Sequence, residues 1–390
     1  MVGGDRERVE YSVRPLMRRA LLVAVIAFVV SVAAPAKASP PPAVRAAAWY
    51  LEGHDGVFLA GGNEHEQRAI ASITKLMTAI VVLEQARLTD VVRVDSRAAG
   101  VGESTVFLQA GEELTTAELL TAMLVPSAND AATALALHVG KGSTARFVAL
   151  MNAKGEELGL TDTNFENAHG LDAQGHVSSA RDATVLTRYA LGIPFIRAAL
   201  SQSTVSLPGG RSFPTTDDLL LSWPALVGGK TGHTRDAGWS QAAAASAGGT
   251  TVYAAVLGSD TRRARNDSLK ELLSYGLAQY RRVTAIDASR VYAEAETGYG
   301  RPSVELVARR ARVRTIRLGT PLIERVVSPS SVALPVREGE RLGRIEVYDG
   351  NRLVAASNLV AAAGVSEPGV LVKARWYATR TAANLWGIFA

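Results

Sequence analysis

The chain of 390 residues carries 42 basic and 37 acidic side chains, is 47% hydrophobic and contains no cysteine. This length corresponds to about two or three domains. The missing cysteine excludes disulfide scaffolds, thiolate metal sites and a thiol nucleophile. The net charge is −3 over residues 39–282 and +5 over residues 283–390. This distribution argues against nucleic-acid binding, which usually gathers basic and aromatic side chains on one surface.

Residues 1–38 have the order of a secretory signal peptide. Two arginines precede an uncharged apolar run over residues 20–34, and a small-residue triplet follows at 36–38. The run is shorter than the roughly 20 residues of a membrane-spanning helix, although an uncleaved anchor helix stays open as an alternative. Met17 offers an alternative start that gives a leader of ordinary length. We therefore expect an exported protein, in the periplasm or cell wall, whose export route, Sec or twin-arginine, stays open.

Residues 39–282 show the pattern of a domain that mixes helices with strands. The residues Ile73, Leu76, Met77 and Ile80 recur at helical spacing and predict an amphipathic helix. The other expected elements are strands at 47–51, 57–59, 227–232, 239–245 and 251–258, and helices at 115–125, 130–139, 143–158, 180–191 and 264–281. Strands at both ends with helices between them predict one sheet assembled from both ends of this region.

Residues 283–367 read as a small all-β domain. Short β-rich runs occur at 304–308, 311–317, 331–336, 343–348 and 352–356. Arg310, Arg312 and Arg314 alternate with other residues, which places three cations on one strand face. We expect that face to contact anionic lipid or wall polymer.

Residues 368–390 form a tail that mixes aromatic and aliphatic side chains with lysine and arginine. This composition is typical of an amphipathic helix at a membrane surface. Packing of the tail on the β domain is the alternative.

The candidate nucleophile is a serine that lies three residues before a lysine. Only 7 of the basic residues are lysine, and the pattern Ser-x-x-Lys occurs once, at Ser72 and Lys75. Because residues three apart on a helix are neighbours, the amine can reach the hydroxyl. A hydroxyl needs an adjacent base, and lysine can serve where arginine cannot be deprotonated. A helix-capping serine beside a solvated lysine is the alternative.

Two further motifs are candidates for the same site. Lys230-Thr231-Gly232 occurs once, on a predicted strand after two glycines. It does not belong to a phosphate-binding loop, because Pro224 occupies the position of the first glycine and no helix follows. Ser127-Ala128-Asn129 lies at a helix junction, where capping is the alternative.

In order and context, these motifs closely resemble the D-alanyl-D-alanine carboxypeptidases of the low-molecular-mass penicillin-binding protein family. The resemblance covers about residues 45–280 and is carried by Ala71–Ala79, Phe107–Ala131, Asn167–Asp182 and Gly229–Trp239. It implies an α+β, β-lactamase-like serine hydrolase domain, with an antiparallel sheet and a helical lobe, followed by the small all-β domain. It also implies removal of the terminal D-alanine from peptidoglycan stem pentapeptides, acylation by β-lactams and no cofactor.

The resemblance also implies a role for each motif residue. Ser72 is the acylated nucleophile, Lys75 its general base, Ser127 the proton relay to the leaving D-alanine, and Asn129 a ligand of the substrate peptide. The substrate-binding residues on the predicted strand are Lys230, Thr231, Gly232 and His233. Lys230 would lower the pKa of Lys75 and, with Thr231, bind the terminal carboxylate, while the backbone N–H groups of Ser72 and His233 would form the oxyanion hole.

Other functions stay open as alternatives. A D,D-endopeptidase is a near relative, and a β-lactamase shares the motifs, although position 128 is alanine where a class A enzyme typically has aspartate. A non-catalytic cell-wall-binding or penicillin-sensing protein is the alternative from another class. His169 and His176 are expected to be structural, and the absence of H-E-x-x-H and G-x-S-x-G patterns argues against a metallopeptidase and an α/β-hydrolase.

Overall fold

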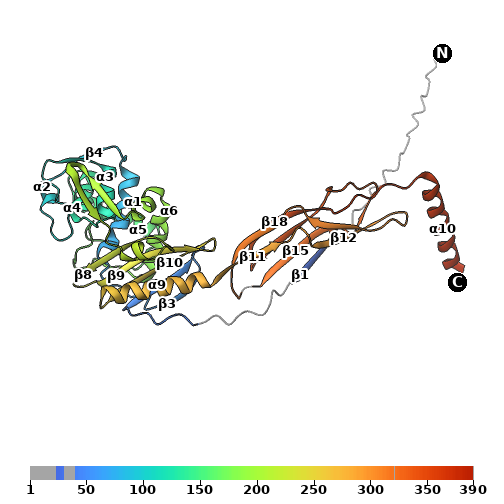
Figure 1. Ribbon diagram of the computed structural model, residues 1–390, viewed down its shortest axis with the longest axis horizontal. Helices are drawn as coiled ribbons and strands as arrows, with labels where there is room; N and C mark the ends of the chain where they lie inside the picture. Colours follow the sequence, from blue (N-terminus) through green and yellow to red (C-terminus); the bar gives the residue numbers. More distant parts are fainter. Residues whose placement is uncertain (1–22, 30–39, 320, 390) are drawn as a thin grey trace, which may run out of the picture. The chain divides into compact units, whose positions relative to one another are not determined.

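The computed structural model describes residues 23–29, 40–319 and 321–389 (Figure 1). The chain divides into two compact units. The catalytic unit comprises Ala36–Arg282 and Thr315–Leu318, and the β unit comprises Val283–Arg314, Gly319–Ala390 and the strand β1. Each unit has its own sheet.

The sheet of the catalytic unit is antiparallel and has the strand order β3-β2-β10-β9-β8. Its strands are β2 (Ala48–Gly53), β3 (Phe58–Gly62), β8 (Leu226–Thr234), β9 (Gly238–Ala247) and β10 (Thr250–Ser259). The first two come from the start of the unit and the last three from its end. The prediction of one sheet assembled from both ends of this region is therefore confirmed.

Both faces of this sheet are buried, which explains why its central strands are rich in alanine. Successive side chains of a strand point to opposite faces. Ala242 and Ala244 of β9 accordingly join the core shared with the helical lobe, whereas Ala243 and Ala245 join the core under α9. Figure 1 shows α9 running along the sheet. Small side chains on both faces let the helices pack closely against the strands.

The helices of the catalytic unit are α1 (Lys75–Gln85), α2 (Ser96–Ala99), α3 (Thr116–Leu124), α4 (Asn129–Val139), α5 (Thr144–Glu157), α6 (Ala180–Gly192), α7 (Pro194–Leu200), α8 (Asp218–Ser222) and α9 (Arg262–Ala278). Six of them, α1, α3, α4, α5, α6 and α9, lie within a few residues of the predicted ranges, whereas the short helices α2, α7 and α8 were not predicted. The unit also contains two small two-stranded antiparallel sheets: β4 (Val91–Arg93) with β5 (Glu113–Thr115), and the hairpin of β6 (Thr204–Leu207) with β7 (Arg211–Pro214). Residues 75–82 of α1 are all buried, so this helix runs through the core.

The β unit contains a seven-stranded sheet with the order β1-β15-β17-β18-β13-β12-β16. Its strands are β1 (Val23–Val29), β12 (Val291–Thr297), β13 (Val304–Ala308), β15 (Leu322–Pro329), β16 (Ser331–Val332), β17 (Arg341–Asp349) and β18 (Arg352–Ala361). A two-stranded sheet joins β11 (Tyr280–Ile286) to β14 (Arg312–Arg317).

Two β-domain expectations were incomplete. The strand expected at 331–336 has only two residues, Ser331 and Val332, which pair with Glu296 and Thr297 of β12. The sequence analysis also missed β12, in which only Ala295 is buried, and β15, although β15 alternates between buried and less buried positions along its length.

One described segment falls within the predicted signal peptide. Val23–Val29 forms β1, antiparallel to β15. Its valine, isoleucine and phenylalanine have high strand propensity, and the edge of β15 offers unpaired backbone groups. The rest of the leader, including Met17, lies outside the described residues, so the signal peptide stays a prediction.

The tail forms the helix α10 (Val370–Phe389), and the sequence analysis expected a helix in this segment. Val370 and Leu371 are more than four-fifths exposed, whereas the rings of Trp376 and Tyr377 contact Tyr299 of the β unit. Over the described ranges, no helix combines the length and the apolar character that a membrane span requires.

Candidate active site

The candidate nucleophile lies where a short 3-10 helix, Ala71–Thr74, passes into α1. Lys75 Nζ lies 2.7 Å from Ser72 Oγ. Ser72 does not cap the helix through its side chain, because no side-chain capping bond forms at either helix start. The capping alternative is therefore wrong, and the hydroxyl faces the amine. Ala71 has a φ of 47°, a left-handed conformation of the kind that concentrates at functional sites.

The amine of Lys75 is fully buried and has three partners. Besides Ser72 Oγ, its Nζ donates to Asn129 Oδ1 and to the backbone oxygen of His169, each at 2.7 Å. A neutral amine has two N–H bonds and one lone pair. If the two N–H bonds go to the two carbonyl oxygens, the lone pair is directed at the Ser72 hydroxyl. The site is therefore arranged for a lysine that accepts the serine proton.

Electrostatics favour the neutral form of this lysine. Burial lowers the pKa of Lys75 well below its usual range, and the nearby charge of Lys230 lowers it further. The sequence analysis identified Lys230 as a cause of this shift. Burial of the Lys75 amine is the larger cause of the lowered pKa. It depends on the helices and β8 that surround the amine in the folded protein.

The second motif lies at the turn between α3 and α4. Ser127 is buried, has a φ of 71°, and its hydroxyl has no hydrogen-bond partner among the described residues. Asn129 begins α4, and its Nδ2 donates to the Gly102 oxygen at 3.1 Å while its Oδ1 accepts from Lys75. The amide of Asn129 is thus fixed between a loop and the lysine.

The third motif lies on β8 and is also buried. Lys230 is 1% exposed, and burial lowers its pKa to about 7, with Arg265 adding to the shift and Asp217 opposing it. Thr231 Oγ1 lies 2.8 Å from Thr216 Oγ1. An anion that bound here would raise the pKa of Lys230 and favour its charged form.

Gly232 brings β8 directly against the nucleophile turn. A Cβ atom at this position would lie 2.7 Å from the Ile70 oxygen and 3.2 Å from the Ser72 nitrogen. Only glycine permits this approach, which also brings the following peptide of β8 close to Ser72. The ring of His233 stacks on Trp239 with centroids 4.0 Å apart. The oxyanion hole from the amides of Ser72 and His233 stays a prediction.

Two histidines of the resemblance lie beside the site in different roles. His169 contributes its backbone oxygen to Lys75, which the sequence analysis did not foresee. Gly170 follows with a φ of 88°, and a Cβ there would lie 2.0 Å from the Ala71 oxygen. No local pattern marks a carbonyl group, so only the family resemblance could have indicated this segment.

His176 is a buried structural residue. The Glu166 N–H donates to its Nδ1 at 3.0 Å, so the proton lies on Nε2, which donates to Thr74 Oγ1 at 2.7 Å. Burial lowers the pKa of His176 to about 4 and that of His169 to about 4.

The sequence analysis missed the charged residues behind Lys230. Arg265 of α9 is buried, and burial lowers its pKa to about 10. Asp217 is also buried; burial raises its pKa, while its carboxylate accepts hydrogen bonds from the N–H groups of Leu219 and Leu220. These residues are far apart in sequence and belong to no motif, so only the packing of α8 and α9 revealed them.

A serine hydroxyl beside a buried lysine that can be deprotonated defines a class of enzyme. It is the class of serine hydrolases in which lysine, rather than histidine, is the base. Residues 35–261 match the profile of the S11 peptidase family, described as D-alanyl-D-alanine carboxypeptidase. The chain belongs to this family.

Curated relatives match along most of their length. The chain is 33% identical to the D-alanyl-D-alanine carboxypeptidase DacD of Escherichia coli K12 over 380 residues, which cover 90% of this chain and 96% of that protein. Among solved structures, penicillin-binding protein 5 of Haemophilus influenzae aligns with a TM-score of 0.62 at 28% identity, covering 84% of this chain and all of that one. Penicillin-binding protein 6B of Escherichia coli also gives 0.62, at 29% identity, with coverages of 84% and 99%. These similarities confirm the predicted fold class and enzyme class, a serine-type D-alanyl-D-alanine carboxypeptidase.

Proposed function

We propose that the chain removes the terminal D-alanine from peptidoglycan stem pentapeptides through an acyl-enzyme on Ser72. The observation that carries this proposal is the environment of the Lys75 amine. Two carbonyl oxygens take its N–H bonds, and the third partner is the Ser72 hydroxyl. Membership of the carboxypeptidase family supports the choice of substrate.

Acylation follows from this arrangement. The neutral amine of Lys75 accepts the hydroxyl proton as Ser72 Oγ attacks the carbonyl carbon of the penultimate D-alanine. The resulting oxyanion accepts hydrogen bonds from the backbone N–H groups of Ser72 and His233, where one donor is typically worth about 10²–10³ in rate. Ser127 relays the proton to the leaving nitrogen, the C–N bond breaks, and free D-alanine departs. Asn129, bound to Lys75, orients the substrate peptide.

Recognition of a chain end requires a group that binds the terminal carboxylate. Lys230 and Thr231 lie side by side on β8, next to Gly232, whose backbone approaches Ser72. A substrate carboxylate at Lys230 would hold the terminal D-alanine so that its peptide bond faces the hydroxyl. Binding would also keep Lys230 protonated, because an adjacent anion raises the pKa of an amine.

Deacylation uses the same groups with water in place of the leaving amine. Lys75 takes a proton from water, the hydroxide attacks the ester, and Ser72 leaves with a proton. A β-lactam would acylate Ser72 by opening its ring. Its leaving nitrogen stays attached to the acyl group and blocks the approach of water, so the adduct persists.

The decisive experiment measures D-alanine released from a pentapeptide that ends in D-Ala-D-Ala. We expect release by the wild-type chain, none by Ser72→Ala, and normal release by Ser201→Ala, which changes an exposed serine at the end of α7. Absence of release by wild-type enzyme would overturn the proposal.

A fluorescent penicillin separates the alternatives. A stable adduct that Ser72→Ala abolishes supports the carboxypeptidase, whereas rapid release of hydrolysed penicillin indicates a β-lactamase. Labelling without D-alanine release would favour a penicillin-sensing protein. Cleavage of a crosslinked stem peptide dimer would indicate endopeptidase activity.

We also propose that the protein is exported and contacts the membrane peripherally through α10. The exposed side chains of Val370 and Leu371 lie near Lys373 and Arg375, a combination that suits an anionic membrane surface. Co-sedimentation with lipid vesicles tests this. We expect deletion of residues 368–390 to reduce binding, and unchanged binding would refute a role for the tail.

A further inference from the structure

A surface hollow of the β unit is lined by positive charge and by no acidic side chain. Its volume is about 460 Å³. We call it the arginine hollow, and its lining residues are Arg309, Arg310, Arg312, Arg344, Ala356, Ser357 and Asn358. Nothing in the carboxypeptidase reaction described above uses these residues.

The hollow forms where β13 leaves the sheet. β13 pairs with β18 only from Leu359 onwards, and after the Asn358 oxygen, which accepts from the Arg309 N–H, the edge of β18 is open to arginine side chains. Arg312 Nε donates to the Ala356 oxygen at 3.5 Å, so the side chain lies along this open edge. Among the described residues, its terminal guanidinium nitrogens have no partner and remain available for a ligand.

The backbone that presents the neighbouring arginines is fixed. The N–H of Arg309 donates to the Asn358 oxygen at 2.9 Å, and the N–H of Arg310 lies 3.4 Å from Ser357 Oγ. Both side chains are exposed and form no ion pair within the described part of the chain. The side chains of Arg309 and Arg310 therefore extend from a backbone segment that hydrogen bonds hold in place, and no acidic side chain among the described residues pairs with them.

The sequence analysis placed Arg310, Arg312 and Arg314 on one strand face. Arg312 and Arg314 lie two residues apart on β14, and their Nε atoms donate to the Ala356 and Val354 oxygens of β18, whereas Arg310 precedes the strand. Arg314 does not line the hollow. Arg344 lines the hollow because β17 pairs with β18 and places Arg344 opposite Asn358.

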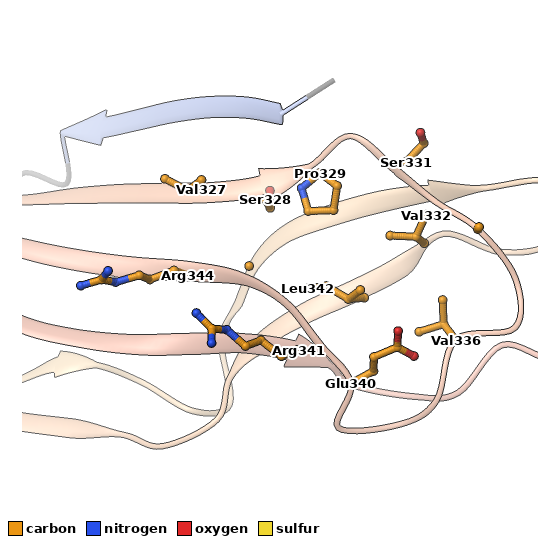
Figure 2. Close-up of a pocket in the computed structure, with 12 residues that line it drawn as sticks. Val327, Ser328, Pro329, Ser331, Val332, Val336, Glu340, Arg341, Leu342 and Arg344 are labelled. Carbon is orange, nitrogen blue, oxygen red and sulfur yellow. The ribbon is translucent and has the colours of Figure 1, made fainter. Parts of the chain in front are cut away.

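Arg344 connects the hollow with a second, more apolar one. The second hollow has a volume of about 690 Å³ and is also lined by Arg341 (Figure 2). Figure 2 shows Arg341 and Arg344 extending to the same side, away from Val332 and Val336. A bulge between Arg341 and Gly343 shifts the strand register between the two arginines.

The charge balance points to an anionic ligand. Arg344 is paired with Glu346 at 2.8 Å, whereas Arg309, Arg310 and Arg312 have no carboxylate partner among the residues that the structure describes. The positive charges that line the hollow repel one another, and an anion bound between them would be attracted to each of them. A guanidinium group presents a planar fork of donors that matches phosphate oxygens, and Ser357 and Asn358 add neutral polar groups.

We propose that the arginine hollow binds a phosphate group, carried either by a lipid headgroup or by a soluble phosphate compound. This site is separate from the active site, so its failure would leave the proposed carboxypeptidase activity untouched.

The first test titrates the full chain with inorganic pyrophosphate by calorimetry. In Arg309→Gln/Arg310→Gln we expect the Kd to rise about tenfold, since each charge-assisted hydrogen bond contributes substantially. The matched control, Arg301→Gln/Arg337→Gln, removes the same charge from exposed arginines of the same unit, and its Kd should stay within about twofold of wild type. No binding by wild-type protein, or equal effects of the two double variants, would overturn the proposal. D-alanine release should be unchanged in both.

The second test identifies the source of the phosphate. The same proteins are co-sedimented with vesicles of phosphatidylglycerol and of phosphatidylcholine. Loss of phosphatidylglycerol binding in the hollow variant, but not in the control, assigns the site to a lipid headgroup. Unchanged vesicle binding together with weakened pyrophosphate binding assigns it to a soluble phosphate compound.

Discussion

The close approach of β8 to the nucleophile predicts that Gly232→Ala inactivates the enzyme while leaving it folded. The added Cβ would lie 2.7 Å from the Ile70 oxygen, which is 0.7 Å inside the 3.4 Å at which ordinary van der Waals contact begins. It would also lie 3.1 Å from Ala71 Cβ and 3.2 Å from the Ser72 nitrogen. Most of these atoms are backbone and cannot rotate away, so β8 and the nucleophile turn must separate.

The separation should affect catalysis more than stability. It moves the amides of Ser72 and His233 apart, and loss of one oxyanion donor costs about 10²–10³ in rate. Overpacking of this kind typically destabilises a protein by about 1–3 kcal/mol. The assay is the acylation rate constant with a fluorescent penicillin, measured beside thermal unfolding.

Gly192→Ala is the matched control, because apart from the adjacent backbone of its own helix nothing lies within 4 Å of the Cβ position there. We expect the control to acylate at the wild-type rate. An acylation rate of Gly232→Ala within about threefold of wild type would refute the idea that this strand positions the oxyanion donors.

Three further predictions concern protons. Burial lowers the pKa of Lys230 to about 7, so kcat/KM for a substrate with a free carboxylate should fall above that pH. Arginine stays charged, so the pH–rate profile of Lys230→Arg should not show this decline. Ser127→Ala should slow D-alanine release about 10²–10⁴-fold, and a smaller loss would speak against a proton relay. The pKa of His176 lies at about 4 when folded and near 6.5 when unfolded, so the unfolded state binds the extra proton and stability falls by roughly 3 kcal/mol as pH drops through this interval. Denaturant titrations of His176→Gln should show a shallower decline, and an equal slope would contradict the assignment.

The sequence determined the elements and the identity of the motifs. Helical spacing along residues 73–80, the alternating strands and the single Ser-x-x-Lys pattern are local properties of the chain. Local signals failed where the ladder partner decides the outcome, as at β12, β15 and the two-residue strand β16. They also did not indicate Arg344, which strand pairing places opposite Asn358 beside the other cations of the β unit.

Only the tertiary structure decided the chemical state of the site. The pKa of Lys75 depends mainly on burial, and burial exists only when α1, the His169 segment and the Asn129 turn enclose the amine. The need for glycine at position 232 likewise arises from a contact between segments about 160 residues apart. A sequence can specify which side chains are present and how they repeat along the chain, whereas desolvation and close approach depend on groups that meet only in the folded protein.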